Sequence, residues 1–214
     1  MGVLYNSRIV TDGLVLCFDA GDRMSYPGAG TTWTDLSKNR NNGTLVNGPT
    51  FNSANGGSVV FDGTNERISI NSTNIGSTFT AFMWVKFDSI GGVLAGHQSN
   101  NNGGYIFWVS DSNTIYASTT GGYGNISNAG LVTDQWVLLT NVRTGTSASL
   151  YKNSIVLGSF TMGSADNILS SIGSYSGGGY RLNGQIGLMQ VYNRALPAAE
   201  ITQNYKATKG RFGL

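Results

Sequence analysis

Aromatic and amide side chains are concentrated in residues 97–125, and one more tyrosine follows a glycine-rich patch further along the chain. Flat aromatic rings pack against the apolar faces of sugars, while amide, imidazole and backbone groups hydrogen-bond to sugar hydroxyls. The candidate ligand-binding residues with this chemistry are His97, Asn101, Tyr105, Trp108, Tyr116, Tyr123 and Tyr180. The alternative is structural, in that Trp108 and Tyr116 would cover a sheet and the tyrosines would brace loops.

The acidic residues do not form a catalytic pattern. A retaining glycosidase needs two carboxyl groups about 5 Å apart, which alternate positions on one strand would provide. The chain has two glutamates, Glu66 beside a turn and Glu200 in an expected helix, and no expected strand carries acidic residues two or four positions apart. The single histidine, His97, lacks a nucleophile-elbow motif. We therefore predict no catalytic residues and a non-enzymatic protein.

Charge and composition narrow the class of partner. Only 11% of residues are charged and the net charge is +2, too little for the basic footprint of a nucleic-acid-binding protein. No apolar run approaches the ~20 residues of a membrane span, and no N-terminal segment has the pattern of a secretion signal. We expect neither a nucleic-acid nor a membrane partner, and folding in a cytoplasm. The lone Cys17 lies in an apolar run, which is typical of a small buried residue.

Strands must position the candidate residues. Alternating segments recur with turn signals mostly 8–12 residues apart, which is typical of an all-β sandwich or barrel. The clearest are residues 79–87, with Phe and Met on one face and Phe82 and Trp84 on the other, and residues 186–192, apolar on both faces and so expected in mid-sheet. Pro197 fits the first turn of a short C-terminal helix. Its buried face would carry Ala198, Ile201 and Tyr205.

Several motifs carry a resemblance to a known family. They are Phe61-Asp62-Gly63-Thr64-Asn65, the aromatic strand FTAFMWVKF, Trp136 at a strand start, Tyr151-Lys152-Asn153, and the closing VYNRAL element followed by Ala199-Glu200-Ile201. Over residues 13–205 the chain is similar to the laminin-G-like members of the concanavalin A-like lectin/glucanase superfamily. This implies an all-β jelly-roll sandwich of two curved antiparallel sheets with one short C-terminal helix. We expect an N-terminal arm or edge strand (1–12), the jelly-roll domain (13–206) and a C-terminal tail (207–214).

A second resemblance concerns the setting. The segments GLVLCFDAGDRMSYPG, TTWTDLSKNRNNGTL and NYKATKGRFGL are similar to versions of this domain in virion proteins of tailed bacteriophages. This implies a virion protein, folded in the host cytoplasm, that decorates the capsid or lies near the tail. Its expected partners are phage capsid or tail proteins, cell-surface glycans and a second copy of the chain, with docking through residues 1–10 or 206–214. The alternative is a free-standing carbohydrate-binding lectin.

Two neighbouring positions depart from the family pattern. Many relatives carry two acidic residues just before the VYNRAL element, and one of them helps hold a structural calcium ion. Gly187 and Leu188 stand at these positions here. A hard cation needs several oxygen ligands, usually with a carboxylate among them, so we predict no metal ligands and no cofactor. Asp19 and Asp22 remain as other sources of calcium oxygens, and the alternative for them is turn formation.

Overall fold

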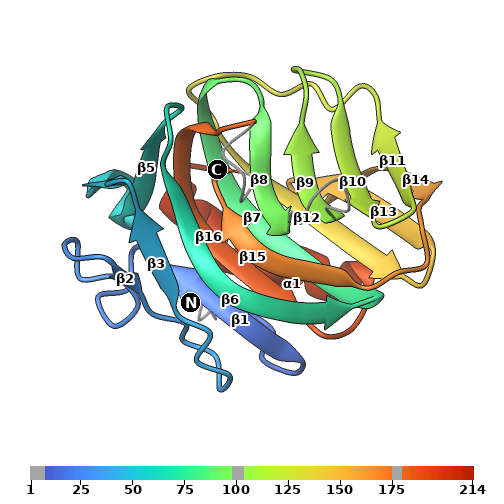
Figure 1. The fold of residues 1–214 in the computed structure, drawn as a ribbon, viewed down its shortest axis with the longest axis horizontal. Helices are drawn as coiled ribbons and strands as arrows, with labels where there is room; N and C mark the ends of the chain where they lie inside the picture. Colours follow the sequence, from blue (N-terminus) through green and yellow to red (C-terminus); the bar gives the residue numbers. More distant parts are fainter. Residues whose placement is uncertain (1–7, 98–103, 175–179) are drawn as a thin grey trace, which may run out of the picture.

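The computed structural model describes residues 8–97, 104–174 and 180–214. Within these ranges, two eight-stranded antiparallel sheets pack face to face (Figure 1). The first sheet has the order β14 (Ile155–Thr161), β13 (Ser147–Lys152), β12 (Trp136–Thr144), β7 (Thr78–Ser89), β16 (Asn183–Tyr192), β5 (Ser58–Asp62) and β4 (Thr50–Asn52), with β1 (Leu14–Asp19) also paired to β16. The second has the order β11 (Gly122–Ile126), β10 (Ile115–Thr119), β9 (Gly104–Val109), β8 (Gly92–His97), β15 (Asn167–Ile172), β6 (Arg67–Gly76), β3 (Gly43–Val46) and β2 (Thr32–Trp33). The predicted jelly-roll sandwich is confirmed.

The main core lies between the two sheets. On β7, Phe79, Met83 and Phe87 point inward and are fully buried, as the alternation predicts. They meet inward residues of the second sheet, among them Ile68 on β6 and Phe107 on β9. Full burial of side chains of this size contributes about 1.5–3 kcal/mol each, so the inward face of β7 stabilises the packing of the two sheets.

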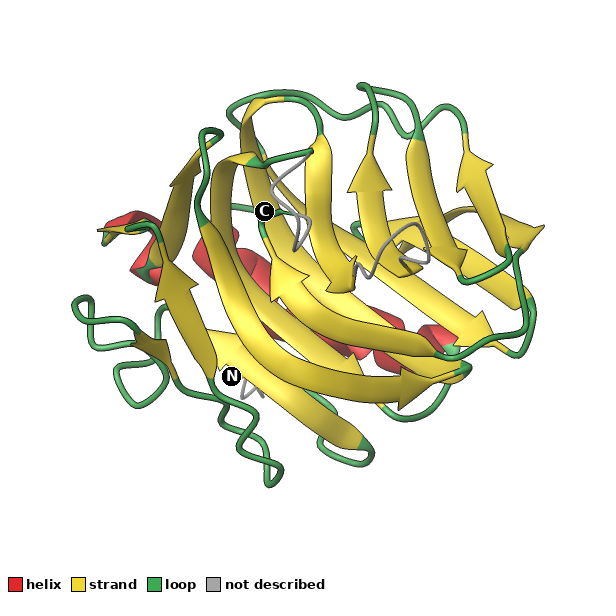
Figure 2. Cartoon of the chain, viewed as in Figure 1, coloured by secondary structure: helices red, strands yellow, loops and turns green. Residues whose placement is uncertain are grey.

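A second apolar cluster covers the outer face of the first sheet. The helix α1 (Ala198–Thr208) begins directly after Pro197, and the 3-10 helix η2 (Lys209–Phe212) continues it. Phe212 stacks on Trp84 with ring centroids 4.4 Å apart, and Ile201 is fully buried in the same cluster, whereas Ala198 is exposed. Figure 2 shows the helices, in red, on the side of this sheet that faces away from the second sheet. We call the first sheet the helix-covered sheet and the second the open sheet.

The expected tail is part of this packing. The boundary placed at residue 206 falls inside α1, and residues 207–212 complete the helix and η2. The sequence alone does not reveal this because Phe212 is the one large aromatic in a stretch of small and basic residues. None of the described helices is long and apolar enough to span a membrane.

The strand β16 is central to the helix-covered sheet. It pairs with β7 along one edge and with β5 and β1 along the other. Met189 and Val191 belong to the core between the sheets, while Leu188 and Tyr192 belong to the outer cluster. The mid-sheet position and the two apolar faces predicted for residues 186–192 are confirmed.

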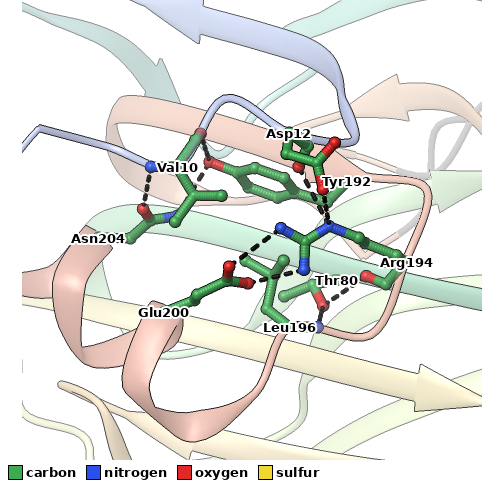
Figure 3. A network of polar contacts seen from close by, with 8 residues as sticks. All are labelled: Val10, Asp12, Thr80, Tyr192, Arg194, Leu196, Glu200 and Asn204. Carbon is green, nitrogen blue, oxygen red and sulfur yellow. Dashed lines mark hydrogen bonds and ion pairs between the residues drawn. The ribbon is translucent and has the colours of Figure 1, made fainter.

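The VYNRAL element ties the two ends of the domain together (Figure 3). The Tyr192 hydroxyl donates to the Val10 carbonyl at 2.8 Å, and the Asn204 side chain accepts from the Val10 amide at 2.8 Å and donates to the Tyr192 hydroxyl at 2.9 Å. All three residues are buried. Val10, which we expected to belong to a docking arm, is therefore packed into its own domain.

Arg194 makes the second half of this network. Its guanidinium contacts Glu200 at 2.7 Å and Asp12 at 3.0 Å, so it connects the start of α1 with the N-terminal segment. The Thr80 hydroxyl donates to the Arg194 carbonyl at 2.9 Å and accepts from the Leu196 amide at 2.8 Å (Figure 3). These contacts fix the turn between β16 and α1 against β7.

The segment of residues 21–49, which contains the short strands β2 and β3, is held by a buried carboxylate. Trp33 is fully buried and stacks on Phe18 with ring centroids 5.2 Å apart. Asp35, which the sequence did not single out, is also fully buried. Its Oδ1 accepts from the backbone amides of Cys17 and Ser37, and its Oδ2 accepts from the Ser37 hydroxyl and the Asn41 amide, each at 2.8 Å. Four donors thus satisfy the carboxylate and join the segment to β1.

Cys17 gives a test of the outer cluster. Burial, together with the nearby charge of Asp19, raises the pKa of the Cys17 thiol from 9.0 to about 12. Because the thiolate is the reactive form, we expect the native protein at pH 8 to resist Ellman's reagent and the urea-unfolded chain to react with one thiol per chain. Because folding raises the pKa of the thiol, burial of the neutral Cys17 favours the folded state fully below pH 9. The free energy of unfolding should then fall as the pH rises from 9 towards 12. Rapid labelling of the native protein would contradict this.

Candidate functional site

Five of the seven predicted ligand-binding residues form one row of aromatic rings. Tyr105 and Trp108 come from β9, Tyr116 from β10 and Tyr123 from β11, and Tyr180 lies between β15 and β16. The centroid distances are 5.5 Å for Tyr105–Trp108, 4.5 Å for Trp108–Tyr116, 6.1 Å for Tyr116–Tyr123 and 5.3 Å for Trp108–Tyr180. Figure 1 shows β9, β10 and β11 side by side at one end of the open sheet.

The row lies on the outer face of the open sheet. In β9, Ile106, Phe107 and Val109 are buried in the core, whereas Tyr105 and Trp108 are half-buried and contact the other rings. Two consecutive inward residues break the period of two, and the β8–β9 pairing shows irregular register at this point. Such a bulge turns side chains relative to the regular pleat, so Tyr105 and Trp108 share one face although they are three residues apart.

The rings divide into a braced pair and two exposed rings. Trp108 and Tyr116 are directly opposite in the β9–β10 pairing, and their planes are 28° apart, so they stack on each other. Tyr123 is 71% exposed and Tyr180 is 60% exposed. Trp108 and Tyr116 therefore support the row, as the structural alternative supposed, while Tyr123 and Tyr180 present ring surface to solvent.

Tyr180 adopts an unfavourable backbone conformation. Its φ of +50° lies in the left-handed region, which is uncommon for a bulky residue. Its carbonyl accepts a 2.7 Å hydrogen bond from the Val93 amide of β8, which helps to hold this conformation. Backbone strain of this kind clusters at binding and catalytic sites. The surrounding structure thus fixes the Tyr180 ring against Trp108.

His97 lies on the same sheet but outside the row. It is half-buried at the end of β8, and its Nδ1 is 2.7 Å from the Ser170 hydroxyl of β15. No acidic side chain is hydrogen-bonded to His97 among the described residues, so this pair lacks the third member of a Ser-His-Asp arrangement. Asn101 lies outside the described residues.

Asn125 is a polar neighbour of the row that the sequence analysis missed. It is exposed on β11 directly opposite Tyr116, and it shares the face of Tyr123 because the two are two residues apart. It brings an amide beside the rings, the role expected of Asn101. The glycine-rich segment around it did not suggest a strand, although Tyr123 and Asn125 alternate with glycines.

Comparison with known proteins identifies the family. The family model described as the concanavalin A-like lectin/glucanases superfamily matches residues 62–202, more than half of the chain. The chain belongs to this superfamily. No match was found among curated protein sequences.

Solved structures show the same concanavalin A-like fold. Domain 4 of the arabinanase AbnA from Geobacillus stearothermophilus, in complex with arabinotriose, is 14% identical with a TM-score of 0.69, and the match covers 92% of this chain and 100% of that one. Trypanosoma rangeli sialidase in complex with sialic acid is 13% identical with a TM-score of 0.70, covering 93% of this chain and 33% of the sialidase. Botulinum neurotoxin type C, described as dependent on two ganglioside molecules for cell entry, is 11% identical with a TM-score of 0.64, covering 93% and 52%.

In this concanavalin A-like chain, Gly187 and Leu188 stand where many relatives carry the acidic pair that helps to hold calcium. Leu188 is buried in the outer cluster, and the Gly187 carbonyl accepts from the guanidinium of Arg211 at 3.2 Å. The same guanidinium donates to the carbonyls of Asn55 at 2.9 Å and Gly57 at 2.6 Å and pairs with Asp19. The Arg211 guanidinium thus binds the carbonyl and carboxylate oxygens at this position. In the described ranges, no three His, Cys, Asp or Glu side chains are close enough together to hold a metal ion.

The acidic residues proposed as other oxygen sources act in turns or ion pairs. Asp19 accepts from the Gly21 amide at 2.8 Å in addition to its contact with Arg211, and Asp22 accepts from the Met24 amide at 2.8 Å. These are the side-chain to backbone contacts of Asx turns. In the described part of the chain, neither residue belongs to a group of three or more His, Cys, Asp or Glu side chains that could hold a metal ion.

We expect Arg211→Met to lower the free energy of unfolding by about 2–3 kcal/mol, because it removes charge-assisted hydrogen bonds and leaves carbonyl groups without donors. Urea denaturation measures this change. Arg23→Met, at an exposed position in the neighbouring loop, is the matched control and should change stability by less than about 0.5 kcal/mol. Neither calcium nor EDTA should shift the melting temperature of the unmodified protein. A rise of several degrees with calcium would contradict the assignment.

Proposed function

We propose that this protein binds carbohydrate without hydrolysing it, as a lectin-fold component of a bacteriophage virion. The observation that carries the carbohydrate part is the aromatic row. Two exposed rings, Tyr123 and Tyr180, flank the Trp108–Tyr116 stack, on a sheet face opposite the one that packs in the core. Exposed aromatic rings beside the Asn125 amide match the mixed apolar and hydroxylated surface of a sugar.

The solved relatives support the same proposal. Domain 4 of AbnA, whose whole length matches this chain, is in complex with arabinotriose, and the neurotoxin relative is described as interacting with gangliosides. Both are described in contact with glycans, which favours the same class of ligand for this chain.

The absence of hydrolysis is proposed from the positions of the carboxylates. The strands β8, β9, β10 and β11 contain no Asp or Glu. Glu200 is paired with Arg194 on the far side of the helix-covered sheet. Retaining and inverting glycosidases need two carboxyl groups beside the scissile bond. The strands under the aromatic row supply no such carboxyl group to a bound sugar.

The virion setting is proposed from the similarity of residues 13–28, 31–45 and 204–214 to phage proteins. Attachment to capsid or tail proteins would need a contact of about 800 Å² per partner. Val10 and Phe212 are buried within the domain, so a contact through the expected docking segments would use their exposed residues, such as Lys206 and Leu214, or residues 1–7, which lie outside the described ranges. The alternative is a free-standing carbohydrate-binding lectin, which the aromatic row would serve equally well.

Two measurements test the proposal. The purified protein is applied to a glycan array, and its co-sedimentation with intact phage particles is measured separately. Glycan binding together with particle association is the expected result. Glycan binding without particle association would favour the free-standing lectin, and failure to bind any glycan would overturn the carbohydrate assignment. Release of reducing ends from a bound polysaccharide would overturn the non-enzymatic part.

A further inference from the structure

We infer that the aromatic row takes an uncharged glycan chain longer than one sugar unit, and not a terminal acidic sugar such as sialic acid. This inference rests on the proposed carbohydrate binding and names the class of ligand. It comes from two properties of the open sheet, namely the distribution of charge along the segments that form it and the separation of its exposed rings.

The part of the open sheet that carries the row is free of fixed charge. Residues 92–110, 112–133 and 167–180 contain no Asp, Glu, Lys or Arg, and all 13 basic and 11 acidic residues lie elsewhere in the chain. These segments form β8, β9, β10, β11 and β15 and include every ring of the row. Their one titratable side chain besides tyrosine is His97, whose Nδ1 is hydrogen-bonded to Ser170.

A charge-free face discriminates against acidic sugars. Proteins recognise carboxylate and sulfate groups through charge-assisted hydrogen bonds from Arg or Lys, which are roughly twice as strong as neutral ones. An acidic sugar on this row would lose part of the hydration of its carboxylate and gain no cation from these segments in return, which is unfavourable. An uncharged sugar meets the aromatic faces and the Asn125 amide without this penalty.

Four of the described cations lie on or beside these segments. Arg143, which is fully buried, is hydrogen-bonded to Asn167, and Lys152 donates to the Ala129 carbonyl at 3.0 Å, so both reach the segments from the helix-covered sheet. Arg67 is on β6, which is separated from β8 by β15. Arg181 directly follows Tyr180 and is exposed. Arg181 is therefore the side chain by which an acidic sugar could be held, and replacing it separates the two classes of ligand.

The spacing of the exposed rings indicates an extended ligand. Tyr180 and Tyr123 are at opposite ends of the row, and the stacked Trp108 and Tyr116 lie between them. A single sugar ring is about as large as one aromatic ring and can cover only one of the exposed tyrosines. A chain that crosses β9, β10 and β11 contacts both, and the affinity then grows with chain length.

The test is isothermal titration of the whole protein with two sets of probes. One set is uncharged arabino-, xylo- and malto-oligosaccharides of increasing length, and the other is sialyllactose and oligogalacturonides. Each titration is repeated from about 0.01 M to about 0.1 M salt, over which the Debye length falls from about 30 to about 10 Å. We expect an uncharged series to bind with at least tenfold higher affinity for the trisaccharide than for the monosaccharide, and less than a twofold change with salt.

The Arg181→Gln variant completes the experiment. It should bind the uncharged chain as the unmodified protein does. Preferential binding of an acidic probe, weakened by salt and lost in Arg181→Gln, would overturn the inference and leave carbohydrate binding in place. Equal affinity for the monosaccharide and the trisaccharide would overturn the extended-chain part. No binding by either set would overturn the proposed function together with the inference.

Discussion

The double variant Tyr123→Ala/Tyr180→Ala is expected to bind its glycan about 30- to 100-fold more weakly than the unmodified protein, with an unchanged fold. Each ring contributes about 0.5–1.5 kcal/mol through stacking and a further amount through burial of apolar surface. A loss of about 2–3 kcal/mol in total corresponds to this change in Kd, since 1.4 kcal/mol is tenfold. Titration calorimetry with the glycan selected on the array measures the effect.

The exposure of the two tyrosines makes this experiment clean. Tyr123 and Tyr180 are 71% and 60% exposed, so their removal should change the unfolding midpoint little. Met24→Ala removes another side chain that is 78% exposed, far from the row in the sequence, and serves as the matched control. Unchanged glycan affinity in the double variant, or an equal loss in the control, would show that the row is not the binding surface.

Asp35→Ala is expected to destabilise the protein by about 3–5 kcal/mol, a large part of the 5–15 kcal/mol typical of a domain. The substitution leaves the Cys17 and Ser37 amides, the Ser37 hydroxyl and the Asn41 amide without their shared acceptor. Buried donors without partners cost about 1–3 kcal/mol each when they cannot relax towards water. The loop between β2 and β3 would then separate from β1, and the urea midpoint would fall.

Two further variants give the control for Asp35. Asp62 makes a similar turn contact, with the Thr64 amide at 2.7 Å, but it is exposed, so Asp62→Ala should leave the midpoint nearly unchanged. Asp35→Asn keeps one carboxamide oxygen as an acceptor and should be intermediate. If Asp35→Ala were as stable as Asp62→Ala, the four hydrogen bonds would not hold the loop.

The strands that the sequence predicts best are those with strong patterns of their own. In β7 and β16 the apolar residues fill both faces, and the two clusters on either side of the helix-covered sheet use them as predicted. The strands β2, β3, β4 and β11 are short and rich in Gly, Thr and Asn. Their backbone pairing depends on neighbouring strands more than on their own side chains, so no local pattern marks them.

The candidate site was predictable in its residue types but not in its assembly. Tyr180 is 64 positions from Tyr116 in the sequence, and only the pairing of β15 with β8 and the hydrogen bond from Val93 bring it to Trp108. The partners of Arg211 are mainly backbone carbonyls, which leave no trace in residue identity. Asp35 likewise binds mostly amides that any residue could supply.

The central position of β16 has a consequence for biosynthesis. This strand pairs with β1, β5 and β7, which are all made before it. Until residues 183–192 have been translated, β1, β5 and β7 lack the strand that pairs with them in the centre of this sheet. The Val10 amide likewise lacks its acceptor Asn204, which lies 194 positions downstream. Completion of the helix-covered sheet therefore follows synthesis of residues 183–192, and nascent chains stalled before this point would be the species most prone to aggregate.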